Sequence, residues 1–304
     1  MKRLRVGVIF GGRSGEHEVS LQSAASVLGA LDRAKYDVVP IGITKDGGWL
    51  LSADPLRELA AGNPGPRQAA LPVTLPTSAL NRVERAEALG PLDVVIPILH
   101  GPYGEDGTVQ GLLDLADVPY AGSGVVGSAV GMDKSVMKSV FRACGLPVPD
   151  WLTLTRSAWR NDPAGVKQRI TRQFAYPMFV KPCNLGSSVG ITKVHALGEL
   201  DAALALAAAY DRRVLVERAV PNAREIEVSV LGNDDPQASV CGEIVPSNEF
   251  YDYNAKYIDG KSQAIIPADL PPDLAERVRA MAVEAFRAVD AAGFARVDFL
   301  LDRE

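Results

Sequence analysis

Residues 180–190 read VKPCNLGSSVG, an apolar run that ends in Lys181 and passes into a turn of small residues. In the phosphate-binding loop GxxxxGK[ST] the lysine follows the glycines, whereas here it precedes them, so this is not a P-loop. Successive N–H groups of Gly186, Ser187 and Ser188 can still cradle anionic oxygens. The glycines also favour a flap that closes over a site and excludes water.

The sequence on either side of this turn favours a β-hairpin. Residues 177–182 (PMFVKP) and 190–194 (GITKV) are short apolar segments that frame the turn as two strands. Further along, the periodicity predicts a helix at 199–210, strands at 213–217 and 225–231, a helix at 274–291 and a strand at 295–301.

The first third of the chain has a different pattern, that of a parallel sheet. Apolar runs at 6–10, 38–43 and 92–99 predict strands, and a helix follows the first of them. Ser14 is placed to cap that helix. The proline-rich residues 52–80 lack sustained periodicity and are interpreted as a surface excursion. A further helix is expected around residues 132–141.

Length and charge bound the class of protein. A chain of 304 residues predicts two or three domains. The net charge of −5 disfavours a nucleic-acid partner, and no run approaches the ~18 apolar residues of a membrane span. Three cysteines (Cys144, Cys183 and Cys241) lie far apart without CxxC spacing, which favours reduced thiols in the cytoplasm over a zinc site.

Two glycine-rich segments directly follow predicted strands, where ligands of α/β folds collect. Residues 100–111 (HGPYGEDGTVQG) hold His100, two acids and four glycines. Residues 11–20 (GGRSGEHEVS) place Glu16 and Glu18 at the start of a helix, where carboxylates repel phosphate and suit an ammonium group. The alternatives are an ordinary loop capped by Asp106 and glutamates that only complement the helix dipole.

Several charged residues are candidates for a nucleotide site. Lys134, Lys181 and Lys256 are candidates for phosphate contacts, although a single lysine is more often a solvated surface charge. Glu217 ends one strand and Glu225 begins the next, so both carboxylates can accept hydrogen bonds from an adenine amino group or ribose hydroxyls. The alternative for this pair is a solvated strand end.

The last predicted strand carries two charges on one side. Arg296 and Asp298 are two residues apart, so their side chains lie on the same face of the strand. A carboxylate beside phosphates is a hard ligand for Mg²⁺. The alternative is a plain surface ion pair between the two residues.

His17 and His195 are interpreted as structural. A serine hydrolase is disfavoured because GSSVG is not G-x-S-x-G, and a dehydrogenase because no GxGxxG follows the first strand.

Seven segments in this order resemble the D-alanine–D-alanine ligase family of the ATP-grasp superfamily: GGRSGEHEVSL, HGPYGEDGTVQG, VPYAGSG, MDK, VKPCNLGSSVG, YDYNAKY and ARVDFLLD. The resemblance implies an α/β (α+β) protein with an ATP-grasp fold. It implies an N-terminal Rossmann-like substrate domain (1–125), a central ATP-grasp subdomain with the flap (126–213) and a C-terminal ATP-grasp subdomain (214–304).

The resemblance also implies roles for individual residues. Glu16 would hold the ammonium of the first D-alanine, and Ser187 and Tyr257 would be the hydrogen-bond partners of Glu16. His100 would border the substrate pocket. Arg296 would stabilise the acyl phosphate and the tetrahedral oxyanion, and Asp298 would bind metal. The nucleotide contacts would come from Lys134, Lys181, Ser187, Ser188, Glu217, Arg218, Glu225 and Lys256.

The expected reaction joins two D-alanines through an acyl phosphate made from ATP, for peptidoglycan precursors. Lysines, Arg296 and Mg²⁺ or Mn²⁺, with two ions expected, would offset the repulsion between the carboxylate and the γ-phosphate. The flap would shield the acyl phosphate from water. A cytoplasmic homodimer is expected, with no nucleic-acid or membrane partner.

The sequence departs from the family in two respects. The family continues past residue 304 into a strand whose Glu and Asn complete the metal site, so a truncated C-terminal part is expected. Arg218 stands where the family has an adenine-contacting lysine. Two alternatives stay open: a D-alanine–D-lactate ligase, disfavoured by Tyr257 within YDYNAKY, and a catalytically silent nucleotide-binding protein.

Overall fold

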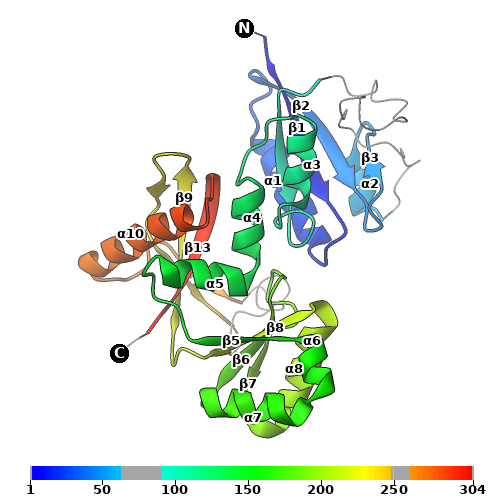
Figure 1. Cartoon of the computed structure of the whole chain (residues 1–304). Helices are drawn as coiled ribbons and strands as arrows, with labels where there is room; N and C mark the ends of the chain where they lie inside the picture. Colours follow the sequence, from blue (N-terminus) through cyan, green and yellow to red (C-terminus); the bar gives the residue numbers. More distant parts are fainter. Residues whose placement is uncertain (1, 63–90, 248, 250–260, 303–304) are drawn as a thin grey trace. The chain divides into compact units, whose positions relative to one another are not determined.

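A computed structural model of the chain describes residues 2–62, 91–247, 249 and 261–302 (Figure 1). The chain divides into two compact units, Met1–Ala129 and Val130–Glu304. Among the described residues, no helix combines the length and apolar character needed to cross a membrane.

The first unit is built on a sheet of strand order β3-β2-β1-β4. Its strands are β1 (Leu4–Gly11), β2 (Tyr36–Ile43), β3 (Trp49–Leu50) and β4 (Val94–Leu99). β1 pairs in parallel with both β2 and β4, and Gly11 lies opposite Ile43 on one side and Leu99 on the other. The predicted parallel sheet is therefore confirmed, and it brings the loops after β1 and β4 to one edge.

Helices cover both faces of this sheet. They are α1 (His17–Ala30) and α2 (Pro55–Ala60) on one face and α3 (Thr108–Leu115) on the other. The next helix, α4 (Val125–Met132), contains the boundary between the units. Leu21 of α1 packs with Phe10 on one face, and Leu113 of α3 packs with Ile9 on the other. The first part of the proline-rich segment is not an irregular excursion, because Asp54 caps α2 and Leu59 of that helix is buried. Residues 63–90 lie outside the described part.

The second unit contains two sheets, of which the first has strand order β5-β8-β6-β7. Its elements are β5 (Trp151–Thr155), β6 (Met178–Pro182), β7 (Thr192–Val194), β8 (Arg213–Arg218), α6 (Arg156–Asn161), α7 (Pro163–Gln173), η1 (Leu197–Glu199) and α8 (Leu200–Tyr210). Ile170 of α7 and Leu204 of α8 pack with Val180 and Val216 of the sheet. β6 and β7 pair antiparallel around the glycine–serine turn, as predicted.

The other sheet of this unit has strand order β10-β9-β11-β12, with β13 on the free side of β9. Its elements are β9 (Arg224–Gly232), β10 (Gln237–Ala238), β11 (Gly242–Val245), β12 (Gln263–Ile265), β13 (Gly293–Leu301) and α10 (Pro272–Ala288). Ile226, Val228 and Val230 alternate along β9 and pack with Phe286 of α10. The opposite face therefore carries the polar residues of β9 and β13.

The helix expected around residues 132–141 is confirmed as α5, and a separate helix before it, α4, was not predicted. α4 ends at Met132, and α5 (Lys134–Ala143) begins after Asp133, whose backbone is extended with φ −87° and ψ 102°. The Asp133 side chain accepts hydrogen bonds from the N–H groups of Ser135 (3.1 Å) and Val136 (3.0 Å). An N-cap carboxylate at this point starts a new helix, and apolar periodicity does not show such a break.

Candidate functional site

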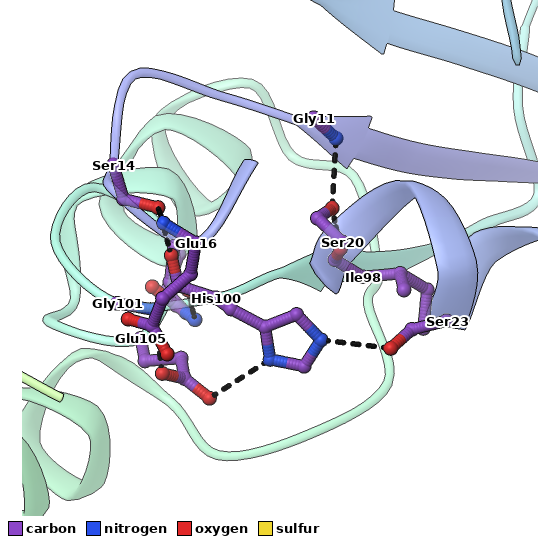
Figure 2. Close-up of polar contacts among 11 residues, drawn as sticks. Gly11, Ser14, Glu16, Ser20, Ser23, Ile98, His100, Gly101 and Glu105 are labelled. Carbon is purple, nitrogen blue, oxygen red and sulfur yellow. Dashed lines mark hydrogen bonds and ion pairs between the residues drawn. The ribbon is translucent and has the colours of Figure 1, made fainter. Parts of the chain in front are cut away.

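In the first unit, Ser20 of α1 joins the ends of two parallel strands (Figure 2). Its side chain is fully buried, and its Oγ accepts a hydrogen bond from the Gly11 N–H (2.7 Å) and donates one to the Ile98 carbonyl. A helix start is thereby held against the carboxyl ends of β1 and β4. The loops that follow these strands are placed side by side by this arrangement.

The loop after β1 depends on glycine. Gly11 has φ +89°, and an added Cβ would lie 2.2 Å from the Ile43 carbonyl oxygen. The neighbouring Gly12 donates its N–H to the same carbonyl (2.8 Å) and accepts at its own carbonyl from Nδ1 of the buried His17 (2.8 Å). His17 therefore supports the loop, in agreement with its structural interpretation.

Ser14 does not cap α1, which corrects the sequence prediction. The N-cap position belongs to Glu16, and no side chain caps the helix there. Instead, Ser14 Oγ donates to the His100 carbonyl oxygen (2.6 Å) and accepts from the Glu16 N–H (3.2 Å). Ser14 thus links the two loops that carry the candidate substrate residues Glu16 and His100.

The Glu16 carboxylate lies in a buried position beside Gly101. The residue is only 6% exposed, and a Cβ at Gly101 would lie 2.2 Å from its Oε2 atom. Gly101 has φ +71°, so its backbone also favours glycine. The side chain of Glu18, by contrast, forms a surface ion pair with Lys45, whose hydrogen bond holds the pKa of Glu18 below its usual value. Glu16 is therefore the substrate candidate of the two.

His100 is held at both ring nitrogens. Its Nε2 lies 3.0 Å from Ser23 Oγ, and its Nδ1 lies 3.7 Å from Oε1 of Glu105. The other carboxylate oxygen of Glu105 accepts from the Gly101 N–H at 2.7 Å. Hydrogen bonding to Glu105 raises the pKa of His100 against the effect of burial, and the charge of Glu16 contributes in the same direction. An imidazole so placed favours its protonated form.

Asp106 orders the loop but does not cap α3 as expected, because the N-cap of that helix is Gly107 and no side chain caps it. Its two carboxylate oxygens accept from the N–H groups of Tyr103 and Thr108, each at 3.0 Å. The buried Gln110 donates to the Gly104 carbonyl (2.9 Å) and closes the same loop from α3. The motif at 100–111 therefore contains both support residues and the candidate site residues His100 and Glu105.

In the second unit, Glu217 is the centre of a buried ionic cluster. It is 3% exposed, so the alternative of a solvated strand end is wrong. Lys181 donates to its Oε1 atom from the adjacent strand β6, and Lys138 Nζ lies 2.8 Å from Oε2. Burial by itself would raise the pKa of Glu217, but the two lysines lower it to about 2. Glu217 is therefore ionised over the whole physiological range.

Lys138 is a member of this cluster that sequence reasoning missed. It is 8% exposed on α5, and burial lowers its pKa against the pull of Glu217. The signal in the sequence was its spacing from Lys134, because residues i and i+4 lie on the same face of a helix. In the structure, Lys138 Nζ contacts Glu217, and Lys134 Nζ donates to the Leu185 carbonyl.

Lys134 contacts the flap. Its Nζ donates to the Leu185 carbonyl, and its backbone N–H donates to the Cys183 carbonyl at 2.9 Å. Burial, together with the positive charge of Lys181, lowers the pKa of Lys134 to about 8. Two of the candidate phosphate lysines, Lys134 and Lys181, are therefore brought together at the base of the flap.

The flap turn itself has an unusual backbone. Ser187 and Ser188 both have positive φ, +48° and +58°. The Val189 N–H donates to the Gly186 carbonyl at 3.1 Å, so the turn is closed by its own backbone. Turns with residues in this conformation can direct successive N–H groups at an anion. The Asn184 N–H, which bonds to Asp211 at 2.8 Å, fixes the start of the turn.

The polar face of the second sheet brings together Arg296, Asp298 and Glu227. Arg296 donates to both carboxylate oxygens of Asp298 (2.8 and 3.0 Å) and lies 3.3 Å from Glu227 Oε1. Asp298 and Glu227 are register partners, and Glu225 follows on the same face of β9 opposite Leu300. Among the residues that the structure describes, no group of three or more His, Cys, Asp or Glu side chains is arranged to hold a metal.

The remaining candidates fall in different places. Arg218 is exposed at the end of β8 and donates its N–H to the Asp150 carbonyl at 3.1 Å. Lys256 and Tyr257 lie outside the described residues. His195 has acidic partners, because its Nε2 lies 3.1 Å from Glu249 and its backbone N–H donates to Glu199. This pair is exposed and lies at the surface.

Comparison with known proteins agrees with this geometry. The family model described as D-ala D-ala ligase N-terminus matches residues 5–123, and the one described as D-ala D-ala ligase C-terminus matches residues 140–304. The two matched segments cover most of the chain.

Individual relatives and solved structures are similar over almost the whole chain. A D-alanine--D-alanine ligase of Natranaerobius thermophilus is 50% identical over 303 residues, which cover 99% of this chain and 83% of the relative. The structure of the D-alanine-D-alanine ligase from Coxiella burnetii has a TM-score of 0.81 at 35% identity, covering 100% of this chain and 82% of the other. The structure of the VanG D-Ala:D-Ser ligase from Enterococcus faecalis has a TM-score of 0.82 at 33% identity, covering 99% of this chain and 87% of the other. The chain belongs to the D-alanine–D-alanine ligase family, which has the ATP-grasp fold.

Proposed function

We propose that this chain joins two D-alanines into D-alanyl-D-alanine, for peptidoglycan precursors, while ATP is split into ADP and phosphate. The observation that carries this proposal is that Lys181, paired with the buried Glu217, lies beside Lys134 at the base of the flap, in a chain of this family. Burial, together with the repulsion between the positive charges of these two lysines, lowers the pKa of Lys134. In a weakly screening interior, such repulsion favours an anionic ligand.

The second unit supplies the nucleotide contacts in this proposal. Lys134, Lys181 and Lys256 bind phosphate oxygens, and the N–H groups of Ser187 and Ser188 close on them from the flap. The nucleoside is held by Glu217 and Glu225 as hydrogen-bond acceptors, with Arg218 at the end of the same strand as Glu217. An ionised Glu217 accepts only, which suits an exocyclic amino group.

The first unit supplies the D-alanine contacts. A buried carboxylate such as Glu16 pairs with the ammonium group of the first D-alanine, and His100 lies on the neighbouring loop. Ser187 and Tyr257 are the proposed hydrogen-bond partners of Glu16. The raised pKa of His100 favours a cationic imidazolium near the substrate carboxylate.

The proposed reaction has two steps. A carboxylate oxygen of the first D-alanine attacks the γ-phosphorus, so that a P–O bond forms and the bond to ADP breaks. The neutral amine of the second D-alanine then attacks the acyl carbon, phosphate leaves, and the amine proton passes to a base. Arg296 stabilises the acyl phosphate and the tetrahedral oxyanion, and the lysines offset the charge that gathers at the γ-phosphate.

The family depends on ATP and magnesium in general, and the donor set of the second sheet fits such an ion in part. Asp298 and Glu227 offer hard carboxylate oxygens on one face, although both contact Arg296. When bound, Mg²⁺ or Mn²⁺ would neutralise phosphate charge. We propose two ions, with Asp298 as a ligand of at least one.

The proposal includes domain boundaries and an oligomeric state. We propose a substrate domain (1–125), a central subdomain that begins at residue 126 and a C-terminal subdomain that ends at residue 304. The boundary expected between residues 213 and 214 is moved to follow β8, because β8 pairs with β5 and β6 of the central sheet. Resemblance to the family supports a cytoplasmic homodimer without nucleic-acid or membrane partners. Light scattering tests the dimer, and a monomeric mass at micromolar concentration contradicts it.

The function is tested by ADP release in the presence and absence of D-alanine, with the product identified by mass. We expect release to depend on D-alanine and to yield one dipeptide per ADP. D-Lactate and D-serine are offered as competing acceptors at neutral pH, because one similar structure is a D-Ala:D-Ser ligase. Preferential formation of the ester or of the serine product would overturn the acceptor assignment. ATP binding without turnover would favour the silent nucleotide-binding alternative.

A further inference from the structure

Lys138 is a buried cation for which the reaction described above has no use. Its side chain is 10% exposed, and its Nζ lies 2.8 Å from Glu217 Oε2 and 5.7 Å from the centre of the Trp151 ring. Burial of a charged lysine costs free energy unless the ammonium is paired with an opposite charge. Here that partner is Glu217.

Each carboxylate oxygen of Glu217 is paired with a different lysine, and the two lysine side chains differ in exposure. Oε1 is bonded by Lys181 from β6, and Oε2 is paired with Lys138 from α5. Lys181 is also the proposed phosphate ligand, and its side chain is more exposed than that of Lys138, 18% against 10%. Lys181 therefore has two alternative anionic partners, whereas Lys138 stays with Glu217.

We propose that Lys138 is a positioning residue that keeps Glu217 paired while Lys181 exchanges this carboxylate for a nucleotide phosphate. Without Lys138, release of Lys181 would leave a buried carboxylate unpaired, which is strongly unfavourable. Lys181 would then stay on Glu217, and the phosphate would compete with a carboxylate for one cation. This inference rests on the proposed function, because it takes the nucleotide roles of Lys181 and Glu217 from there.

The test is a double-mutant cycle on ATP affinity, measured by calorimetry with the full chain. We expect Lys138→Met to weaken ATP binding about tenfold, the effect of one charge-assisted hydrogen bond. In the Glu217→Gln background, the same substitution should change affinity by less than about twofold, because a neutral amide does not retain Lys181. Equal losses in both backgrounds would overturn the proposal and assign Lys138 to packing alone.

Two further variants separate positioning from fold support. Lys138→Arg keeps the charge and should recover most of the affinity. Arg142→Met is the matched control: Arg142 lies one turn further along α5 and stacks on the same Trp151 ring at 4.2 Å, but pairs with Asp150 instead of Glu217. The control should leave ATP affinity unchanged. A tenfold loss in Arg142→Met would contradict the specific role of Lys138.

Turnover provides a readout that is independent of binding. Lys138→Met should raise KM for ATP about tenfold and leave kcat and KM for D-alanine within about twofold, since the bound nucleotide is held by the same groups. A fall in kcat with unchanged KM for ATP would contradict a positioning role. If the unaltered chain binds ATP but does not respond to D-alanine, the proposed function fails, while the calorimetric cycle still decides the role of Lys138.

Discussion

At the scale of single residues, each of the two units places a charged group of opposite sign in a buried or partly buried position. Glu16 is a carboxylate at the edge of a parallel sheet, and the missing side chain of Gly101 leaves room for it there. Lys134 is an ammonium whose pKa is lowered by burial and by the positive charge of Lys181. In both cases the neighbouring residues, and not the charged residue alone, decide what the group can bind.

Substitution of Gly101 tests the position of Glu16. We expect Gly101→Ala to destabilise the fold by about 1–3 kcal/mol, because alanine is strained at φ +71° and its Cβ meets the Glu16 carboxylate. KM for D-alanine should rise by at least about tenfold, since the carboxylate is displaced. Thermal unfolding and steady-state kinetics measure the two effects.

Gly15→Ala is the matched control for this change. Gly15 is the immediate neighbour of Glu16, yet a Cβ there would meet nothing within 4 Å. We expect Gly15→Ala to change the stability of the fold and the KM for D-alanine only slightly. Equal effects of the two alanines would show that the loop is sensitive in general and that Gly101 has no special relation to Glu16.

The lowered pKa of Lys134 predicts a pH dependence of ATP affinity. Phosphate binds the charged ammonium, and this group loses its proton as the pH rises through about 8, so affinity should fall by up to about tenfold per pH unit above that value. The unfolded chain holds this proton up to about 10.5, so the same group makes the ligand-free fold more stable as the pH rises from about 8 to about 10.5. Calorimetry in two buffers should show proton uptake on ATP binding near pH 8.

Lys134→Arg provides the control, because arginine stays charged throughout this range. In that variant the decline above pH 8 should disappear. Constant ATP affinity of the unaltered chain up to about pH 9.5 would refute the assignment of Lys134 to phosphate, because its ammonium is largely deprotonated there.

At the scale of elements, a single serine connects a helix to two strands. Loss of the Ser20 hydroxyl leaves the Gly11 N–H and the Ile98 carbonyl without this partner in a buried position. We expect Ser20→Ala to lower the free energy of unfolding by about 1–3 kcal/mol. Ser26→Ala on the same helix, where the hydroxyl is exposed and bonds to the Gln22 carbonyl, should cost much less in the same denaturant titration.

The flap is expected to gain order when nucleotide binds. Amide hydrogen exchange across residues 184–189 should be fast in the ligand-free protein and slow with ATP and D-alanine, because the N–H groups of Ser187 and Ser188 then bond to phosphate. The exchange of α8, which lies in the packed core, serves as the internal reference. Slow exchange across 184–189 before ligand is added would contradict this expectation.

The elements recovered from sequence are those with a clear apolar period. The runs of β1, β4 and β9 and the hairpin of β6 and β7 are confirmed, because alternate or continuous apolar residues directly reflect burial. The helices α2 and α4 were missed, since both are short segments of ordinary composition, and α2 depends on one N-cap aspartate.

For the site, the sequence located residues and missed relations. Glu16, His100, Lys181 and Glu217 were all identified as candidates, but the pairing of Glu217 with Lys138 depends on a tertiary contact between α5 and β8. The same holds for Ser14, which contacts His100 across two loops instead of capping the helix that follows it. Contacts of this kind have no local signature in the sequence.

At the scale of the whole molecule, each compact unit holds one part of the proposed chemistry. Unit Met1–Ala129 carries the carboxylate suited to an ammonium group, and unit Val130–Glu304 carries the cations suited to phosphates. The central claim is that these two parts serve one reaction. It follows that a change in the first unit should remove turnover and leave nucleotide binding intact.

The most direct test is a comparison of the unaltered chain with Glu16→Gln in two assays, ATP affinity by calorimetry and D-alanyl-D-alanine formed per ADP released. For the unaltered chain, the account predicts one dipeptide per ADP. For Glu16→Gln, it predicts ATP affinity within about twofold and a loss of dipeptide formation of at least about a hundredfold, because the ammonium has lost its buried counter-charge. Undiminished dipeptide formation by Glu16→Gln, or ADP release that does not depend on D-alanine in the unaltered chain, would contradict the account.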